Sequence, residues 1–365
     1  MEKVAIIGDI HLGKHCSDPF RREAIEKGQD AFFEKQLIPE LTERGITKIL
    51  FTGDIHDHRT QLNVRVACRT RRLLKDTFKD FEIIIVQGNH DLYFKTSYEY
   101  SALELFEDIP NVTIYSEKGK KVKILNKQWY IVPWVIQERE KNFIDFLKKL
   151  SERPQEEIDN TVIFGHFELS GVKMEGNNIA IHGMDTKYLL KAAKLTISGH
   201  YHGKSDTEVE ENRLLYVGSP YPLTFINATD IHGYYILDEN LESEFVENKV
   251  SPNFKNIRDT DDFEEVGSLE NTFVNVHYDS EKSEEEFLAL TTKIDSLNPL
   301  TKNYIPYSTR VREDVDGYDE DEDDDVISTD MRHLSKLLID SDMDLKLDKD
   351  KILEKISETL DILNL

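Results

Sequence analysis

The sequence has few of the features that mark a secreted or membrane-embedded protein. Among 365 residues there are only two cysteines, Cys16 and Cys68, too few for a disulfide framework. No apolar run approaches the ~20 residues of a membrane-spanning helix. No signal peptide is visible, because the first apolar run begins at Val4. We therefore expect reduced thiols, no membrane partner and a cytoplasmic protein, in the host cytoplasm if a phage encodes it.

Positive charge is also scarce, and its distribution bears on what the chain can bind. The 46 Lys and Arg residues are outnumbered by 71 Asp and Glu residues, which gives a net charge of −25. Residues 258–365 contain 31 acidic and 12 basic side chains, whereas residues 1–257 contain 40 and 34. Most of the negative charge therefore belongs to the C-terminal third, and the larger N-terminal part remains compatible with an anionic partner.

Five short polar motifs are present, each at the end of an apolar, β-branched run. The runs predict buried strands at Val4–Ile7, Ile49–Phe51, Ile83–Val86, Thr161–Phe164 and Leu195–Ser198. The motifs after them are Gly8-Asp9-Ile10-His11, Gly53-Asp54, Gly88-Asn89-His90-Asp91, Gly165-His166 and Gly199-His200-Tyr201-His202. In open α/β sheets, ligands bind at the carboxyl ends of the strands. The pattern therefore predicts an α/β fold with one site at one sheet edge.

The residue types in these motifs suit a phosphoester hydrolase with two divalent metal ions. Such a centre needs one carboxylate that bridges both ions, and Asp54 stands alone after its strand. Residues two apart on an extended segment point to the same side, so Asp9 and His11 can share one metal. The further nitrogen and oxygen ligands are Asn89, His166, His200 and His202. A mixed set without cysteine favours Mn, Fe or Zn over Ca or a structural zinc.

Taken singly, the motifs are weak signals, because Asp-X-His is common and Gly-Asn-His-Asp can be an ordinary turn. All five in order resemble the calcineurin-like metallophosphoesterases, which implies a four-layer αββα sandwich. The resemblance implies metal one on Asp9, His11, Asp54 and His202, and metal two on Asp54, Asn89, His166 and His200. It also implies that His90 contacts the scissile phosphate and assists the leaving group. The neighbouring Asp91 is our own candidate for the residue that orients His90.

Three further segments look like the SbcD nuclease and its relatives in MRN-type complexes, in a compact phage or bacterial form. They are Asp9 to Gly13, Val217 to Phe225 and Gly233 to Asp238. This resemblance implies a DNA nuclease for recombination, repair or degradation, with exonuclease action on duplex ends and endonuclease action on single strands. It implies two divalent ions, Mn²⁺ first, with Mg²⁺, Fe or Zn as alternatives. It also implies a homodimer within a heterotetramer with an SbcC-like ABC-type ATPase.

Two other functions stay open at this point. One is a metallophosphatase for phosphoproteins or small phosphoesters, and the other is a scaffold that bridges DNA ends for an ABC-type ATPase. One position also departs from the eukaryotic and archaeal relatives, which carry histidine where this chain has Asp57. Its neighbours His56 and His58 either support the metal ligands, contact DNA or are surface loop residues.

A basic segment beside the second motif is a candidate DNA contact. From Arg59 to Lys79 there are seven basic residues and one acid, Asp76. The apolar spacing predicts a helix, on which Arg65, Arg69 and Arg72 share one face. With His58 and Arg59, these arginines are our predicted phosphate-backbone contacts. A solvated helix face or a subunit contact is the alternative.

The predicted organisation has four parts. Residues 1–240 form the nuclease domain and 241–312 a small α+β capping domain, with strands at 272–278 and 304–311. Between them a helix is expected over Ser283–Ser296, since Ser283 and Glu286 form a capping-box pattern. Residues 313–330 are an acidic linker, with ten acids at 313–325. The apolar spacing in residues 331–365 predicts a helical hairpin, and the resemblance implies that it docks on the coiled-coil base of the ATPase.

Overall fold

The computed structural model describes residues 2–14, 18–176 and 178–307. The predicted acidic linker and helical hairpin lie outside the described residues, as do Cys16 and the end of the predicted strand 304–311. Among the described residues, no helix is long and apolar enough to cross a membrane.

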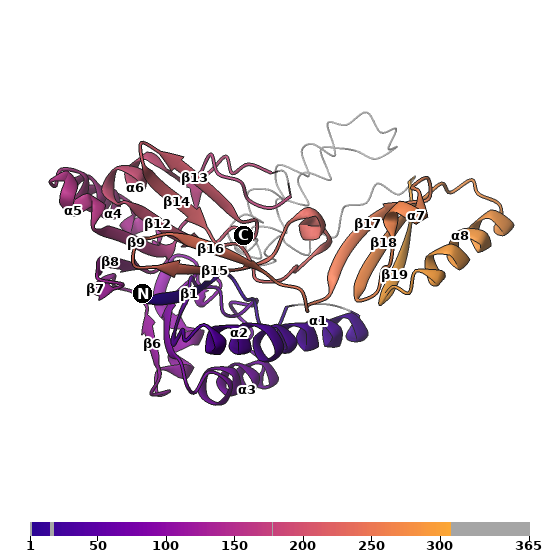
Figure 1. The fold of residues 1–365 in the computed structure, drawn as a ribbon, viewed down its shortest axis with the longest axis horizontal. Helices are drawn as coiled ribbons and strands as arrows, with labels where there is room; N and C mark the ends of the chain where they lie inside the picture. Colours follow the sequence, from indigo (N-terminus) through magenta and orange to yellow (C-terminus); the bar gives the residue numbers. More distant parts are fainter. Residues whose placement is uncertain (1, 15–17, 177, 308–365) are drawn as a thin grey trace, which may run out of the picture. The chain divides into compact units, whose positions relative to one another are not determined.

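Two six-stranded sheets form the centre of the molecule (Figure 1). The first has the order β16-β15-β1-β2-β3-β6, and its strands are β1 (Lys3–Ile7), β2 (Lys48–Phe51), β3 (Glu82–Val86), β6 (Val112–Tyr115), β15 (Gly233–Asp238) and β16 (Ser243–Glu247). The second has the order β13-β14-β12-β9-β8-β7, and its strands are β7 (Lys120–Ile124), β8 (Lys127–Val132), β9 (Thr161–His166), β12 (Leu195–Gly199), β13 (Ser205–Val209) and β14 (Asn212–Tyr216). The central strands of each sheet are parallel. Antiparallel strands lie at the edges, namely β15 and β16 at one edge of the first sheet, and β13 and β7 at the two edges of the second.

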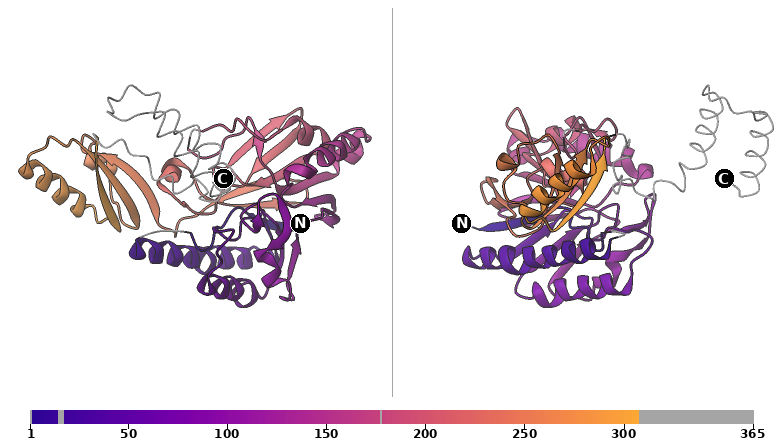
Figure 2. Two further views of the ribbon diagram at one scale, coloured as in Figure 1. Left: turned by 180° about the vertical axis from the view of Figure 1, so that it is seen from behind. Right: turned by 90° about the vertical axis from the view of Figure 1, so that its right-hand side faces the viewer.

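The central strands of the two sheets are apolar on both faces, so one face of each sheet packs against the other sheet and the second face packs against helices. Ile6 and Leu50 of the first sheet share a buried cluster with Phe164 and Ile197 of the second. Helices cover the outer face of the first sheet, namely α1 (Pro19–Ala31), α2 (Ile38–Glu43) and α3 (Val64–Arg72), with π-helical turns at Phe32–Leu37 and Leu73–Thr77. Helices α4 (Gln137–Ser151), α5 (Gln155–Asp159) and α6 (Lys187–Ala192) belong to the second half, and α4 and α6 pack on the outer face of its sheet. The views in Figure 2 show the same layering, and the predicted αββα sandwich is confirmed.

All five predicted ligand-bearing strands are present, as β1, β2, β3, β9 and β12. In the first sheet β1, β2 and β3 are adjacent and parallel, and in the second β9 and β12 are adjacent and parallel. Their carboxyl ends therefore lie at one edge of each sheet. A short hairpin of β4 (Leu92–Phe94) and β5 (Ser97–Ser101) follows the third motif, and β10 (Leu169–Ser170) pairs with β11 (Met184–Asp185) after the fourth.

The predicted boundary at residue 240 needs correction. Strand β16 pairs with β15 in the first sheet, so the sandwich continues to Glu247. The edge strand β16 is half exposed and has few apolar residues, so the apolar pattern predicted a domain boundary that is too early in the chain.

A three-stranded parallel sheet follows, in the order β17-β18-β19. Its elements are β17 (Asn253–Arg258), α7 (Phe263–Val266), β18 (Thr272–Tyr278), α8 (Glu284–Ser296) and β19 (Thr301–Pro306). Helix α8 packs on this sheet (Figure 1), and the capping box of Ser283 and Glu286 is confirmed. Phe254 and Phe273 pack against Ile25 of α1, so the small sheet contacts the sandwich through its own apolar cluster.

Candidate metal centre

The loops after the five strands bring the predicted ligands together at the edge of the sandwich. Asp9, His11, Asp54, Asn89 and His166 are each at most 2% exposed, and His200 and His202 are partly exposed. Buried carboxylates and imidazoles require compensating partners, which are hydrogen bonds, opposite charges or a metal ion. The site thus has a buried floor with two histidines at its rim.

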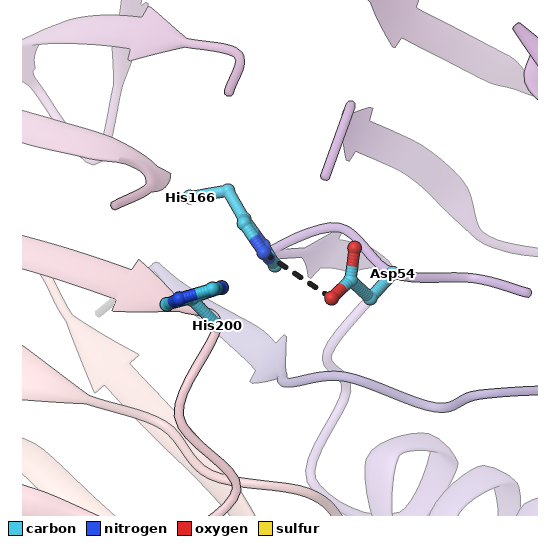
Figure 3. A group of neighbouring side chains, drawn as sticks. All are labelled: Asp54, His166 and His200. Atoms are coloured by element: carbon cyan, nitrogen blue, oxygen red, sulfur yellow. Dashed lines mark ion pairs between the residues drawn. The ribbon is translucent and has the colours of Figure 1, made fainter. Parts of the chain in front are cut away.

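One group of ligands converges on Asp54 and Asn89. His166 Nε2 lies 3.2 Å from Asp54 Oδ2 and 2.9 Å from Asn89 Oδ1, and His200 Nδ1 lies 3.0 Å from the same Asn89 oxygen. Ligand atoms of Asp54, His166 and His200 all lie within 4.8 Å of one another, which is compatible with a shared ion (Figure 3). This is the set expected for metal two.

A second group lies around His11. His11 Nε2 is 3.0 Å from His202 Nε2 and 3.8 Å from Asp54 Oδ2. Both carboxylate oxygens of Asp9 accept a hydrogen bond from the backbone N–H of His200, at 3.2 and 3.0 Å, and Asp9 Oδ1 lies 3.5 Å from His166 Nδ1. The Oδ2 atom of Asp54 lies near an imidazole nitrogen of each group, and its role as the bridging ligand stays a prediction.

The tautomers of the histidines fit a cation at both places. His11 Nδ1 lies 3.2 Å from Asp57 Oδ1, and His202 Nδ1 lies 3.4 Å from Glu175 Oε2. Each carboxylate favours a proton on the Nδ1 that it faces, which leaves the two Nε2 lone pairs directed at each other across 3.0 Å. Two lone pairs repel at that distance unless a cation or a proton lies between them. The donor chemistry therefore fits a divalent metal here.

The same argument holds at His166. Its Nδ1 donates to the carbonyl of Thr52 at 2.8 Å, so its neutral form directs the Nε2 lone pair at Asp54 Oδ2 and Asn89 Oδ1, which are acceptors too. Burial disfavours the imidazolium of His166, but the carboxylates of Asp54 and Asp9 outweigh it and raise its pKa to about 9. A proton on His166 thus takes the place that a metal would have in a loaded site.

The backbone is strained at three of the ligands. His11, Asp54 and His200 have φ angles of +39°, +50° and +94°, in a region that non-glycine residues rarely occupy. The approach is also close, because a Cβ on Gly88 would lie 2.1 Å from Asp54 Oδ1. Strained ligands and an obligatory glycine are typical of a functional site that the surrounding fold holds in place.

With this geometry in place, comparisons with known proteins identify the family. The calcineurin-like phosphoesterase family model matches residues 2–204, more than half of the chain.

The chain belongs to this family. Among curated proteins, exonuclease subunit 1 of Enterobacteria phage T4 is 28% identical over 253 residues, 68% of either chain. The DNA double-strand break repair protein Mre11 of Methanopyrus kandleri is 24% identical over 248 residues, which cover 63% of this chain and about half (51%) of that protein. A solved structure described as a novel archaeal phosphodiesterase has 16% identity and a TM-score of 0.32, covering 67% of this chain and 99% of that one. That structural likeness is too low to carry an argument.

One predicted role in this phosphoesterase requires correction. Asp91 was expected to orient His90, but its side chain accepts hydrogen bonds from three backbone amides, those of Asp54 (3.0 Å), Ile55 (3.0 Å) and Gly88 (2.9 Å). Asp91 therefore holds the second and third ligand loops together. Burial, with the nearby charge of Asp54, raises the pKa of Asp91 to about 7. His90 Nδ1 instead bonds to the backbone carbonyl of Asp57 at 2.6 Å.

Two of the predicted DNA-binding arginines bind within the chain. Arg65 forms an ion pair with Glu26, and Arg69 bonds to Asp30 at 2.7 Å, so both fasten α3 to α1. Arg72 is exposed, Arg59 is buried and His58 is partly buried. The predicted phosphate track along α3 is thus reduced to Arg72, while His58 and Arg59 lie in the loop after Asp57.

His56, in contrast, is a core residue. It is fully buried, lies 3.1 Å from Thr70 Oγ1 through Nε2, and stacks on Phe106. His56 is therefore neither a surface loop residue nor a DNA contact. Burial lowers its pKa to about 3.

Sequence reasoning missed three residues of the phosphoesterase site. Glu175 faces His202, and although burial opposes ionisation, hydrogen bonds from His202 and Asn227 lower the pKa of Glu175 to about 2. Lys14 lies 3.3 Å from Asp57 Oδ1. The ring of Trp134 lies 5.2 Å from that of His200. Trp134 follows the end of the apolar run in β8, so its position was detectable, but Glu175 and Lys14 lie in loops without a local signal.

Proposed function

We propose that this phosphoesterase is a divalent-metal-dependent DNA nuclease, with Mn²⁺ as the preferred ion. The observation that carries the proposal is the pair of ligand groups around Asp54, in each of which nitrogen and oxygen acceptors face one another as they would around a cation. DNA as the substrate is supported by the names of two relatives, an exonuclease subunit and a double-strand break repair protein. Because one of them is named as a subunit, we extend the proposal to a complex with an SbcC-like ATPase through residues 331–365.

The proposed reaction needs the ligand groups to hold two ions and His90 to act on the leaving group. Bound ions would supply Lewis acidity at the phosphate and a water of lowered pKa as nucleophile. His90 lies beside the site, since its backbone N–H donates to Asp54 Oδ1 at 2.9 Å. With Nδ1 bonded to the Asp57 carbonyl, Nε2 is the nitrogen that can carry a proton to the leaving 3′-oxygen.

End-labelled duplex DNA tests this function. The protein is incubated with duplex DNA and Mn²⁺, and a phosphomonoester is run in parallel. A nuclease shortens the labelled strand, a chelator stops the reaction, and the phosphomonoester is spared. Hydrolysis of the phosphomonoester without cleavage of DNA would replace the proposal with a metallophosphatase, and DNA end binding without any hydrolysis would replace it with the scaffold.

A further inference from the structure

A pocket with a volume of about 350 Å³ adjoins the metal centre at His166. Its apolar walls come from Trp134, Phe143 and Phe167, and its polar lining includes Lys95 and Glu168. These residues belong to the β4–β5 hairpin, the segment after β8, helix α4 and the loop after β9. None of these five residues is a predicted metal ligand, so the metal chemistry leaves the pocket without an assigned role.

The aromatic walls are held rigidly. Phe143 on α4 stacks on Phe167 with ring centroids 5.5 Å apart and an interplanar angle of 15°. The backbone of Trp134 is fixed on both sides, because its N–H donates to Gln87 O at 2.8 Å and its carbonyl accepts from Tyr98 Oη at 2.6 Å. Ordered aromatic faces bind planar groups with little loss of conformational entropy.

One polar atom of this wall has no explanation within the described part of the chain. Trp134 is 6% exposed, yet its indole Nε1 has no hydrogen-bond partner among the described residues. A buried donor without a partner is costly, so packing alone does not explain why a tryptophan stands at this position of the wall. The Trp134 ring also lies 5.9 Å from that of His166, so the same side chain borders both the pocket and the metal ligands.

We propose that this pocket takes the nucleobase of a nucleotide next to the scissile phosphate. The inference rests on the proposed nuclease function and adds a base-binding subsite to it. A phosphate held at the metal ligands places its neighbouring nucleoside within reach of a pocket that begins at His166. The volume lies within the range of small-ligand pockets, which combine apolar and aromatic walls with few polar groups. The side chain of a phosphoserine or phosphothreonine has no planar group to fill these walls.

The charged residues of the lining agree with an uncharged base more than with a second phosphate. They are Lys95, at the turn of the β4–β5 hairpin, and the two acids Glu140 and Glu168. Stacking on aromatic faces is tolerant of sequence, because every base has a π-face. The subsite is therefore expected to require a base without selecting one.

Abasic substrates test the subsite. Oligonucleotides carry a tetrahydrofuran nucleotide on one side or the other of a single cleavable phosphodiester, with phosphorothioates elsewhere. Removal of the base on one side should lower kcat/KM of the wild-type protein about 5- to 150-fold, the effect of one base–aromatic stack. In Phe143→Ala, the intact substrate should show a comparable loss, and base removal should have little further effect, as in a double-mutant cycle.

Phe146→Ala is the matched control. Phe146 lies one turn further along α4, is partly buried like Phe143 and stacks on it, but does not line the pocket. This variant should keep the full dependence on the base. A second readout does not depend on hydrolysis. The fluorescence of 2-aminopurine at the same nucleotide should be quenched when the oligonucleotide binds the metal-free wild-type protein, and quenched less when it binds metal-free Phe143→Ala.

The outcomes separate the two proposals. If the wild-type protein cleaves DNA and loses nothing when either neighbouring base is removed, the base subsite is wrong and the nuclease function stands. If it hydrolyses bis(p-nitrophenyl) phosphate but no DNA, the nuclease function itself fails. Should Phe143→Ala not fold, the wild-type comparison of intact and abasic substrates and the 2-aminopurine signal still decide.

Discussion

Replacement of Asp54 by asparagine tests the centre at its shared ligand. Asp54 Oδ2 lies 3.2 Å from His166 Nε2 and 3.8 Å from His11 Nε2, and Oδ1 accepts the N–H of His90. Asparagine keeps the size but removes the charge, and a neutral amide bridges two cations poorly. We expect hydrolysis to be abolished and the metal content to fall from about two ions per chain, the count of a two-metal centre, to about one or fewer.

The size of the effect on stability follows from ligand linkage. A metal at a free concentration one hundred times its Kd stabilises the folded state by about 2.7 kcal/mol per site. Loss of one such site therefore lowers the gain in Tm on adding Mn²⁺ by about 4 °C, because the unfolding entropy is about 2.1 cal/mol/K for each of roughly 300 residues. Metal content is measured after desalting, and thermal unfolding is recorded with Mn²⁺ and with chelator.

Asp76→Asn is the control for this substitution, because Asp76 is an exposed acid in the π-helical turn after α3. It should leave metal content, the Mn²⁺ shift in Tm and hydrolysis unchanged. An Asp54→Asn protein that binds two ions and keeps full activity would remove Asp54 as the bridge.

Four further predictions follow from the same geometry. His90→Asn should keep the metals and DNA binding but lower turnover by ~10²–10⁴-fold, and loss of metal would show that its role is misassigned. Glu175→Gln should weaken metal binding in calorimetry by ~10–100-fold, since it releases the imidazole of His202, and an unchanged affinity would contradict this. The folded-state pKa of His166 is about 9, against an ordinary 6.5. Its positive charge therefore stabilises the metal-free protein below pH 6.5, and this stabilisation is lost as the pH rises through 9. Metal affinity should correspondingly rise about tenfold per pH unit between 7 and 9, and a flat profile would mean that His166 is neutral before metal binds. Truncation after Thr329 should end co-purification with the ATPase but spare cleavage of small phosphodiesters, since every proposed ligand precedes residue 203; unfolding or unchanged ATPase binding would refute it.

The convergence of the proposed metal ligands was predictable because each is encoded next to its own strand. An apolar run that ends in Gly-Asp or Gly-His gives both the strand and the ligand within a few residues, as at Asp54 and His166. The role of Asp91 was not predictable in this way. Its three amide partners come from two loops, and only the parallel pairing of β2 with β3 brings those loops together.

The residues that support the proposed ligands from a distance could not be predicted from the sequence either. Glu175 lies in the loop between β10 and β11, and nothing local distinguishes it from the other acids of the chain. Its assignment depends on the 3.4 Å approach to His202, which follows β12, a strand of another sheet that comes later in the sequence. Contacts between loops are set by the tertiary packing, which local periodicity does not describe.

The basic helix shows why positive charge has to be counted after ion pairs are assigned. Arg65, Arg69 and Arg72 do lie on a helix at the predicted spacing. However, Arg65 and Arg69 form ion pairs with Glu26 and Asp30 of the neighbouring helix α1. An arginine that already holds a carboxylate must break that pair before it can neutralise a phosphate, so its contribution to DNA binding is reduced. Lys95 lies instead in a short hairpin turn beside the ligands, where no run of basic residues drew attention to it. Substitution of Lys95 by methionine should therefore weaken DNA binding and its salt dependence more than the same change at Arg65, and the reverse order would restore α3 as the path of the phosphate backbone.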